Sequence, residues 1–196
     1  MSLVTYNGFL YAIGGSNSGG TPQTTVYIAK IGANGEPQLW HPTDTNKNNW
    51  VYWYSDTALS NARSYFAAVA YNNRMYLIGG LTTSTTVLST NTVQTADIKP
   101  MGTFTSWTTT GMQALSGSGG GNRYGLTANV YNDTIYIVGG STSFGGAPVN
   151  NVDYSKITES NGYLNTWKVA NSLSGSGRLT LGGSFSTVFG LSLIHI

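Results

Sequence analysis

Apolar and polar positions follow the same order in three stretches of this chain. Each stretch has an aromatic residue, a pair of turn-forming residues, a run of apolar and aromatic residues, and two glycines. The turn pairs are Asn7-Gly8, Asn72-Asn73 and Asn132-Asp133, and the glycine pairs are Gly14-Gly15, Gly79-Gly80 and Gly139-Gly140. The opening aromatic residues, Tyr6, Tyr71 and Tyr131, are 65 and 60 residues apart. A period of this length is typical of an array of like supersecondary units.

Each stretch predicts a β-hairpin. Asparagine, aspartate and glycine tolerate the positive φ angles that both central residues of a type I′ turn need. The strand before the turn is small and apolar, as at residues 67–70, and the strand after it is β-branched and aromatic. The glycine pair ends the second strand, where a missing Cβ lets a neighbouring segment approach closely. We expect the tyrosines three residues before each glycine pair to be buried at equivalent positions: Tyr11, Tyr76 and Tyr136.

A second hairpin follows in each copy. Its first strand is predicted at residues 26–31, 93–98 and 152–157, and its turns contain Gly35, Gly102 and Gly162. Its second strand carries a tryptophan, at Trp53, Trp107 and Trp167. Each copy therefore has four antiparallel strands and no helix, as in a β-propeller blade. The arginines that precede each new copy, Arg63, Arg123 and Arg178, are expected to bond backbone carbonyls between blades rather than to bind a ligand.

The order of arginine, small apolar strand, Tyr-x-x-Gly-Gly, third strand and tryptophan resembles the kelch repeat. It is more similar to the longer kelch-like repeats of large bacterial surface proteins, as at Ser155-Lys156-Ile157, Asn161-Gly162 and Trp167. The resemblance covers about residues 4–190, but the tyrosine-to-tryptophan spacing of the short eukaryotic repeat is not kept. It implies an all-β, kelch-type propeller of a bacterial protein that is secreted or on the cell surface. It implies little about function, because propellers host many activities.

The period divides the chain into blades. Residues 1–62 form a partial first blade with an insertion near 40–52, 63–122 and 123–177 form two further blades, and 178–190 begin another. Propellers close with about four to eight blades, and four at this period need about 240 residues. We therefore expect an open, incomplete fragment of 196 residues whose exposed terminal blades could self-associate. Residues 191–196 do not continue the repeat and resemble translated sequencing-adapter sequence, with an ordinary apolar strand as the alternative.

The insertion in the first blade supplies the candidate binding residues. Trp50, Tyr52 and Tyr54 offer flat apolar rings that could stack on sugars. Packing between blades is the alternative for such a cluster, because most aromatic side chains serve as core.

The same insertion faintly resembles a calcium-binding loop. Asp44, Asn46 and Asn48 have the spacing of the first three ligands. Asn49 and Ser55 stand where such a loop has its glycine and its last acidic residue, so we expect no metal.

Composition excludes several classes of function. Charged residues make up 8% and aromatic residues 12%, which indicates a folded β protein rather than a disordered chain. A net charge of +2 without a basic stripe argues against nucleic-acid binding. No apolar run of 18 residues predicts a membrane span, and the N-terminus lacks the regions of a signal peptide. With no cysteine there is no disulfide or thiol chemistry.

No catalytic arrangement can be assembled from the sequence. The two histidines, His41 and His195, have no triad or metal-ligand spacing, and the seven acidic residues are scattered singly. We therefore expect no catalytic residue and no cofactor, and interpret the chain as an interaction module for a protein or glycan. Its long Gly/Ser/Thr-rich loops, at residues 16–25, 81–92 and 141–151, favour the face that carries them. The alternatives are a propeller-borne carbohydrate-active enzyme whose active residues lie outside this stretch, or a structural spacer.

Overall fold

A computed structural model describes residues 1–82, 89–110, 112–115, 121–143 and 146–177, and this part contains strands and no helix. The first sheet consists of β1 (Ser2–Tyr6), β2 (Phe9–Ile13), β3 (Val26–Ile31), β4 (Pro37–Gln38) and β5 (Tyr54–Ser55). The second consists of β6 (Ala67–Tyr71), β7 (Arg74–Ile78) and β8 (Val93–Asp97). The third consists of β9 (Thr127–Tyr131), β10 (Thr134–Val138), β11 (Val152–Lys156) and β12 (Lys168–Val169).

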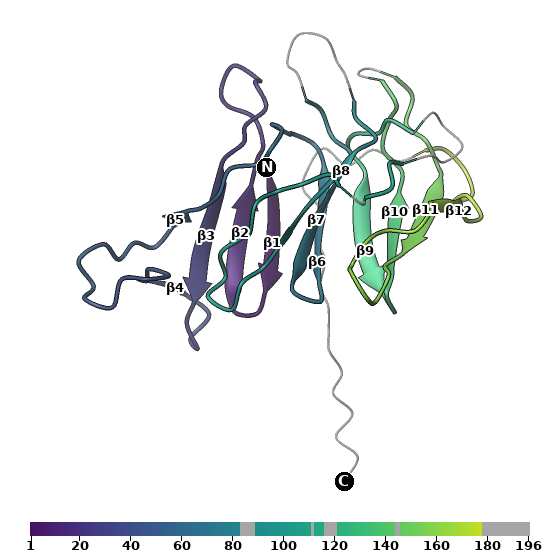
Figure 1. The fold of residues 1–196 in the computed structure, drawn as a ribbon. Helices are drawn as coiled ribbons and strands as arrows, with labels where there is room; N and C mark the ends of the chain where they lie inside the picture. The colour runs from purple at the N-terminus through teal and green to yellow at the C-terminus, as the bar shows by residue number, and fades with distance from the viewer. Residues whose placement is uncertain (83–88, 111, 116–120, 144–145, 178–196) are drawn as a thin grey trace.

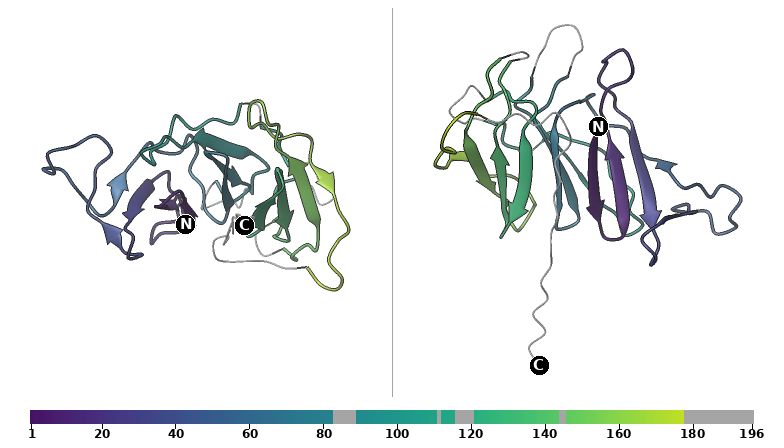
Figure 2. Two further views of the ribbon diagram at one scale, coloured as in Figure 1. Left: turned by 90° about the horizontal axis from the view of Figure 1, so that it is seen from below. Right: turned by 180° about the vertical axis from the view of Figure 1, so that it is seen from behind.

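The three sheets stand side by side in an open arc, and all strand pairs within them are antiparallel (Figures 1 and 2). The tight hairpin turns lie at one edge of the arc and the long loops at the other (Figure 1). The predicted all-β, propeller-like architecture is therefore confirmed. Among the described residues there is no helix long and apolar enough to cross a membrane.

The expected four strands are regular only in the third sheet. In the second sheet the fourth strand is reduced to isolated bridges, Thr95 with Thr108 and Ile98 with Phe104. In the first sheet the insertion divides it, so that β4 and β5 each pair with a different part of β3. Residues 178–196, predicted to hold the start of a further blade and a non-native tail, lie outside the described residues.

The first turn of each sheet has the predicted geometry. Its central residues, Asn7, Gly8, Asn72, Asn73, Asn132 and Asp133, all have positive φ angles, between 46° and 78°. These are the angles of a type I′ turn, whose twist matches that of the two strands it joins.

The core consists of two apolar clusters, one at each boundary between sheets. Strand β6 contributes to both: Ala68 and Ala70 pack toward the first sheet, and Ala67 and Val69 toward the third. Successive side chains of a strand point to opposite faces, so the second sheet is buried on both sides. Small side chains on this strand allow both neighbours to approach.

A main-chain hydrogen bond joins each glycine pair to the next sheet. The Gly15 amide donates to the Arg63 carbonyl over 2.8 Å, and the Gly80 amide donates to the Arg123 carbonyl over 2.8 Å. A Cβ on Gly14 would lie 2.7 Å from the Arg63 oxygen, and Gly79 is in an even tighter position against Arg123. The expected close approach is present at both boundaries. For Gly139-Gly140 the corresponding residue, Arg178, lies outside the described residues.

The side chains of the repeated arginines hold their own sheets together. Arg63 is fully buried and donates to the carbonyls of Gly79 (2.9 Å) and Thr92 (2.8 Å), both in the second sheet. Arg123 forms a buried ion pair of 2.7 Å with Asp153 of the third sheet. The prediction that these side chains bond backbone carbonyls is right for Arg63, but the expectation that they do so between blades is wrong for both, because the arginine main chain makes the contact between sheets. Burial lowers the pKa of Arg63 to about 10, which leaves it charged at neutral pH.

The prediction of three buried tyrosines is right for two of them. Tyr11 and Tyr76 are 0% and 1% exposed, and burial raises the pKa of both. The next sheet covers each: the Tyr11 ring lies 5.1 Å from the Phe104 ring, and the Tyr76 hydroxyl donates to the Gly162 carbonyl. Tyr136 is 37% exposed, so its predicted burial is wrong. It occupies the same register on the outer face of the third sheet, over which the described residues place no further sheet.

Two of the three tryptophans show the converse relation, because they pack toward the preceding sheet. The indole nitrogens of Trp107 and Trp167 donate to the carbonyls of Thr57 and Gln113, in the segments that leave the preceding sheets. Trp53 has the equivalent register beside β3 but is 41% exposed, and the described residues place no sheet before the first.

The close approach of the second and third sheets at Gly79 can be tested by substitution. We expect Gly79→Ala to lower the free energy of unfolding by about 2–4 kcal/mol, because a Cβ adds a clash with the next sheet to the strain of a positive φ. Gly20→Ala is the matched control, since Gly20 also has a positive φ but faces open space. Urea unfolding of both variants measures the difference, and equal costs would contradict the proposed close contact.

The tyrosine positions provide a second pair of variants. Tyr76→Ala should cost about 3 kcal/mol or more through loss of buried area and a cavity. Tyr136→Ala, at the same register but exposed, should cost about 1 kcal/mol or less. The comparison uses thermal and urea unfolding at a protein concentration low enough to keep the chain single, and a Tyr136 cost as large as that of Tyr76 would show that its face is covered within the chain.

Candidate functional site

The insertion predicted to bind ligand forms a loop that projects from the first sheet between β4 and β5 (Figure 1). A bridge between Trp40 and Val51 closes its base. The Asp44 carboxylate accepts hydrogen bonds from the amides of Asn46 and Asn49, both 2.8 Å long. The Trp50 indole nitrogen donates to the Asp44 carbonyl over 2.7 Å. Asp44 therefore organises the loop as a turn.

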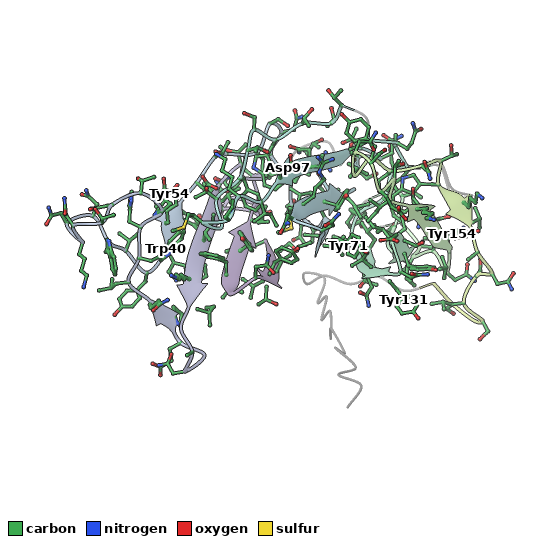
Figure 3. All side chains as sticks on the ribbon, turned by 60° about the horizontal axis from the view of Figure 1, so that its bottom comes forward. Trp40, Tyr54, Tyr71, Asp97, Tyr131 and Tyr154 are labelled. Carbon is green, nitrogen blue, oxygen red and sulfur yellow. The ribbon has the colours of Figure 1, made fainter. Side chains whose placement is uncertain are left out.

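The candidate rings Trp50 and Tyr54 make separate contacts. The Lys47 ammonium lies 5.3 Å from the centre of the Trp50 ring. Tyr54 packs edge-on against His41 at 5.1 Å and lies 5.7 Å from Trp40, with which it is seen in Figure 3. Tyr52 is 55% exposed. Within the described part of the chain, no ring contact joins Trp50, Tyr52 and Tyr54, so sugar stacking by all three stays a prediction.

A cleft of about 230 Å³ lies between the second and third sheets, at the edge of the arc that carries the tight turns. The second sheet and its turn contribute Tyr71, Asn72, Arg74, Tyr76 and Asp97. The third sheet contributes its two turns: Asp133, Ile157, Thr158, Glu159, Ser160, Asn161 and Gly162. Most of these side chains carry hydrogen-bonding groups. A neighbouring cleft of about 220 Å³ shares Arg74 and Asp97 with it and also reaches Tyr163.

Arg74 fixes the geometry between these two clefts. Its Nε donates to the Asp97 carboxylate over 2.6 Å, and its Nη1 donates to the Asn161 carbonyl over 2.7 Å. Its guanidinium carbon lies 5.8 Å from the centre of the Tyr163 ring. These contacts join the second sheet to the last turn of the third. The guanidinium is therefore held in one orientation before any ligand binds.

The residue type at this position of the repeat changes from one boundary to the next. At the equivalent position of the first sheet Phe9 packs against Trp40, with 5.3 Å between the ring centres. Gly102 of the second sheet lies directly against the Phe9 ring, and Gly162 of the third sheet lies against Arg74 in the same way. The apolar Phe9 ring at the first boundary is thus replaced at the second boundary by Arg74, which forms hydrogen bonds. In the sequence, the signal for the cleft is the change from Phe9 to Arg74 between the aligned repeats.

A tyrosine from each of the first two sheets reaches the first turn of the next sheet. The amide of Asn73 donates to the Tyr6 hydroxyl over 2.8 Å. The Tyr71 hydroxyl donates to the Asp133 carboxylate, and this hydrogen bond raises the pKa of Tyr71. The second contact closes one end of the cleft. Figure 3 shows Tyr71 between Asp97 on one side and Tyr131 on the other.

The cleft presents both acceptors and donors around an aromatic ring. Asp97, Asp133 and Glu159 supply carboxylates, and Arg74 supplies the guanidinium. Sites that bind small polar ligands combine a concave shape with a few fixed polar groups of this kind. No group of three or more histidine, cysteine or acidic side chains suited to a metal ion occurs among the described residues.

Comparison with known proteins supports the fold. No protein-family profile and no curated protein sequence matches the chain. Among solved structures, that of YjhT is similar, with a TM-score of 0.61 and 14% sequence identity. The similar region covers 90% of this chain and 53% of the YjhT chain, so the chain spans about half the length of that protein. At this identity the similarity concerns the fold alone.

The insertion should respond to acid through Asp44. Hydrogen bonds from the amides of Asn49 and Asn46 lower the pKa of this carboxyl. A carboxyl group with a lowered pKa in the folded loop stabilises the loop above its ordinary pKa, and this stabilisation is lost as the pH falls through the folded value. We therefore expect the indole N–H resonance of Trp50 to shift below about pH 4. Asp44→Asn should abolish the shift, and a shift that persists in this variant would assign it to another group.

Proposed function

We propose that the chain is a non-catalytic interaction module, a kelch-like propeller segment of a secreted or cell-surface bacterial protein, and that it binds a glycan. The cleft between the second and third sheets is the observation that carries the proposal. The order of arginine, glycine pair and tryptophan supports the kelch-like assignment. The compartment rests on the resemblance to repeats of bacterial surface proteins.

A glycan suits the lining of the cleft. Sugars offer many hydroxyl groups that both donate and accept, and the cleft offers carboxylates, amides and hydroxyls together with the Arg74 guanidinium. The Tyr71 ring, which lines the cleft, and the Tyr163 ring of the neighbouring cleft could contact the apolar face of a sugar ring. Because Arg74 is already hydrogen-bonded on two sides, little order has to be gained when ligand binds.

A protein ligand is the second candidate, and the insertion supports it. Leu39, Val51 and Tyr52 are 46%, 39% and 55% exposed on or beside this projecting loop. Exposed aromatic and aliphatic residues on a protruding segment favour contact with another protein surface.

The glycan proposal is tested by substitution in the cleft. The full chain is applied to a printed array of neutral, acidic and amino oligosaccharides, and hits are titrated by calorimetry. Glu159→Gln, in the third-to-fourth-strand turn of the third sheet, should weaken binding by about tenfold through loss of a charged acceptor. Tyr71→Phe should weaken it less, because it keeps the ring and loses only the hydroxyl.

Glu36→Gln is the matched control for this experiment. Glu36 is an exposed carboxylate in the equivalent turn of the first sheet and does not line the cleft. If the Glu159→Gln variant binds as strongly as the Glu36→Gln control, the ligand binds outside the cleft. A blank array, or loss of binding only on substitution of Tyr52, would favour the protein alternative.

A further inference from the structure

The outer face of the first sheet has the residue pattern of a buried boundary. Leu3, Tyr27 and Trp53 are 40%, 42% and 41% exposed on this face. Their equivalents in the second sheet, Ala68, Gln94 and Trp107, are 0%, 0% and 6% exposed, because they face the first sheet. The first sheet therefore presents the same kind of surface that the second sheet buries.

The outer face of the third sheet is the complementary half of such a boundary. Tyr136 and Tyr154 stack across β10 and β11, with ring centres 5.9 Å apart, and Tyr131 is 75% exposed. Their register corresponds to Tyr76, Thr95 and Tyr71 of the second sheet, which face the third. Figure 3 shows Tyr131 and Tyr154 at one end of the arc, and Trp40 and Tyr54 of the first sheet toward the other.

We propose that two copies of the chain associate through these faces, with the third sheet of each copy packed on the first sheet of the other. Each copy has one face of each type, so two identical contacts related by a two-fold axis satisfy all four faces. The resulting ring has six sheets, two times the three described here, which is within the range of four to eight that propellers use.

Three observations favour a second copy as the occupant of these faces. The two faces match each other because the repeat itself builds the same contact twice within the chain. An open arc that carries unlike, complementary faces at its two ends can pair head to tail with a second copy, and a two-fold rotation then closes the ring. The region similar to YjhT covers 53% of the YjhT chain, so two copies of this region would be about as long as YjhT.

The proposed contact between the two copies includes a polar interaction between a tyrosine and a turn. Tyr6 bonds the turn at Asn73, and Tyr71 bonds the turn at Asp133, across the two boundaries within the chain. By the same register Tyr131 of one copy would reach the turn at Asn7 and Gly8 of the other. This makes Tyr131 the residue on which the association should depend most, and its exposure makes its substitution safe for the fold.

Sedimentation velocity of the full chain over a range of concentrations tests the proposal. The expected result is a two-copy particle at high concentration, in equilibrium with the single chain. Tyr131→Glu on one face and Tyr27→Glu on the other should each weaken association by about tenfold or more, since a charge is placed in an apolar contact. Tyr136→Glu and Leu3→Glu are second variants for the two faces, in case either first variant unfolds.

Met101→Glu is the control, because Met101 is 47% exposed in a turn of the second sheet and lies on neither face. It should leave association unchanged. Weakening by Tyr131→Glu alone would indicate contact between two third sheets, and would overturn the head-to-tail arrangement. A mass that grows beyond two copies, or a single chain at every concentration, would also overturn it; in the second case residues 178–196 are the next occupant to test.

Discussion

The arrangement of the sheets depends on one hydrogen bond, from the second glycine of a pair to the main-chain carbonyl of the arginine that opens the next sheet. At both described boundaries this bond is 2.8 Å long, and the first glycine leaves no room for a Cβ. Packed sheets ordinarily lie about 10 Å apart, so such direct main-chain contact needs residues without side chains. The arginine side chain then secures the other end within its own sheet, Arg63 through main-chain carbonyls and Arg123 through its ion pair with Asp153. A backbone contact of this kind is insensitive to the residues around it, and the faces between the sheets can therefore vary.

The features that could be predicted from the sequence are those that a short segment determines by itself. Asn72-Asn73 specifies a turn through its own φ angles, and the glycine pair at Gly79 signals close approach through its missing side chains. Burial could not be predicted in the same way. Tyr76 and Tyr136 have the same local sequence signal and very different exposure, because burial depends on whether a neighbouring sheet is present. Trp53 differs from Trp107 for the same reason.

The candidate cleft was missed because its residues are brought together by register rather than by proximity in the sequence. Arg74 and Asp97 are opposite each other across β7 and β8, and Asn161 comes from the next sheet. The useful signal was a difference within the repeat: Phe9 and Lys30 occupy the positions that Arg74 and Asp97 take one sheet later. In an array of equivalent units, the shared positions serve the scaffold, and a position where one unit departs from the others is the better guide to a site. The aromatic residues of the insertion stood out in the sequence, yet Trp50 lies against Lys47 and Tyr54 packs on Trp40 and His41, which leaves Tyr52 as the most exposed of the three.

Burial of the second sheet on both faces has a consequence for how the array comes apart. In arrays of stacked units, stability is approximately the sum of what each unit contributes and what each boundary contributes. The first and third sheets each have one boundary in the described chain, and the second has two. Fraying should therefore proceed from the outside inward, with the amides of β6, β7 and β8 exchanging with solvent last. The alanines of β6, which look like the least remarkable residues of the chain, would then belong to its most persistent element.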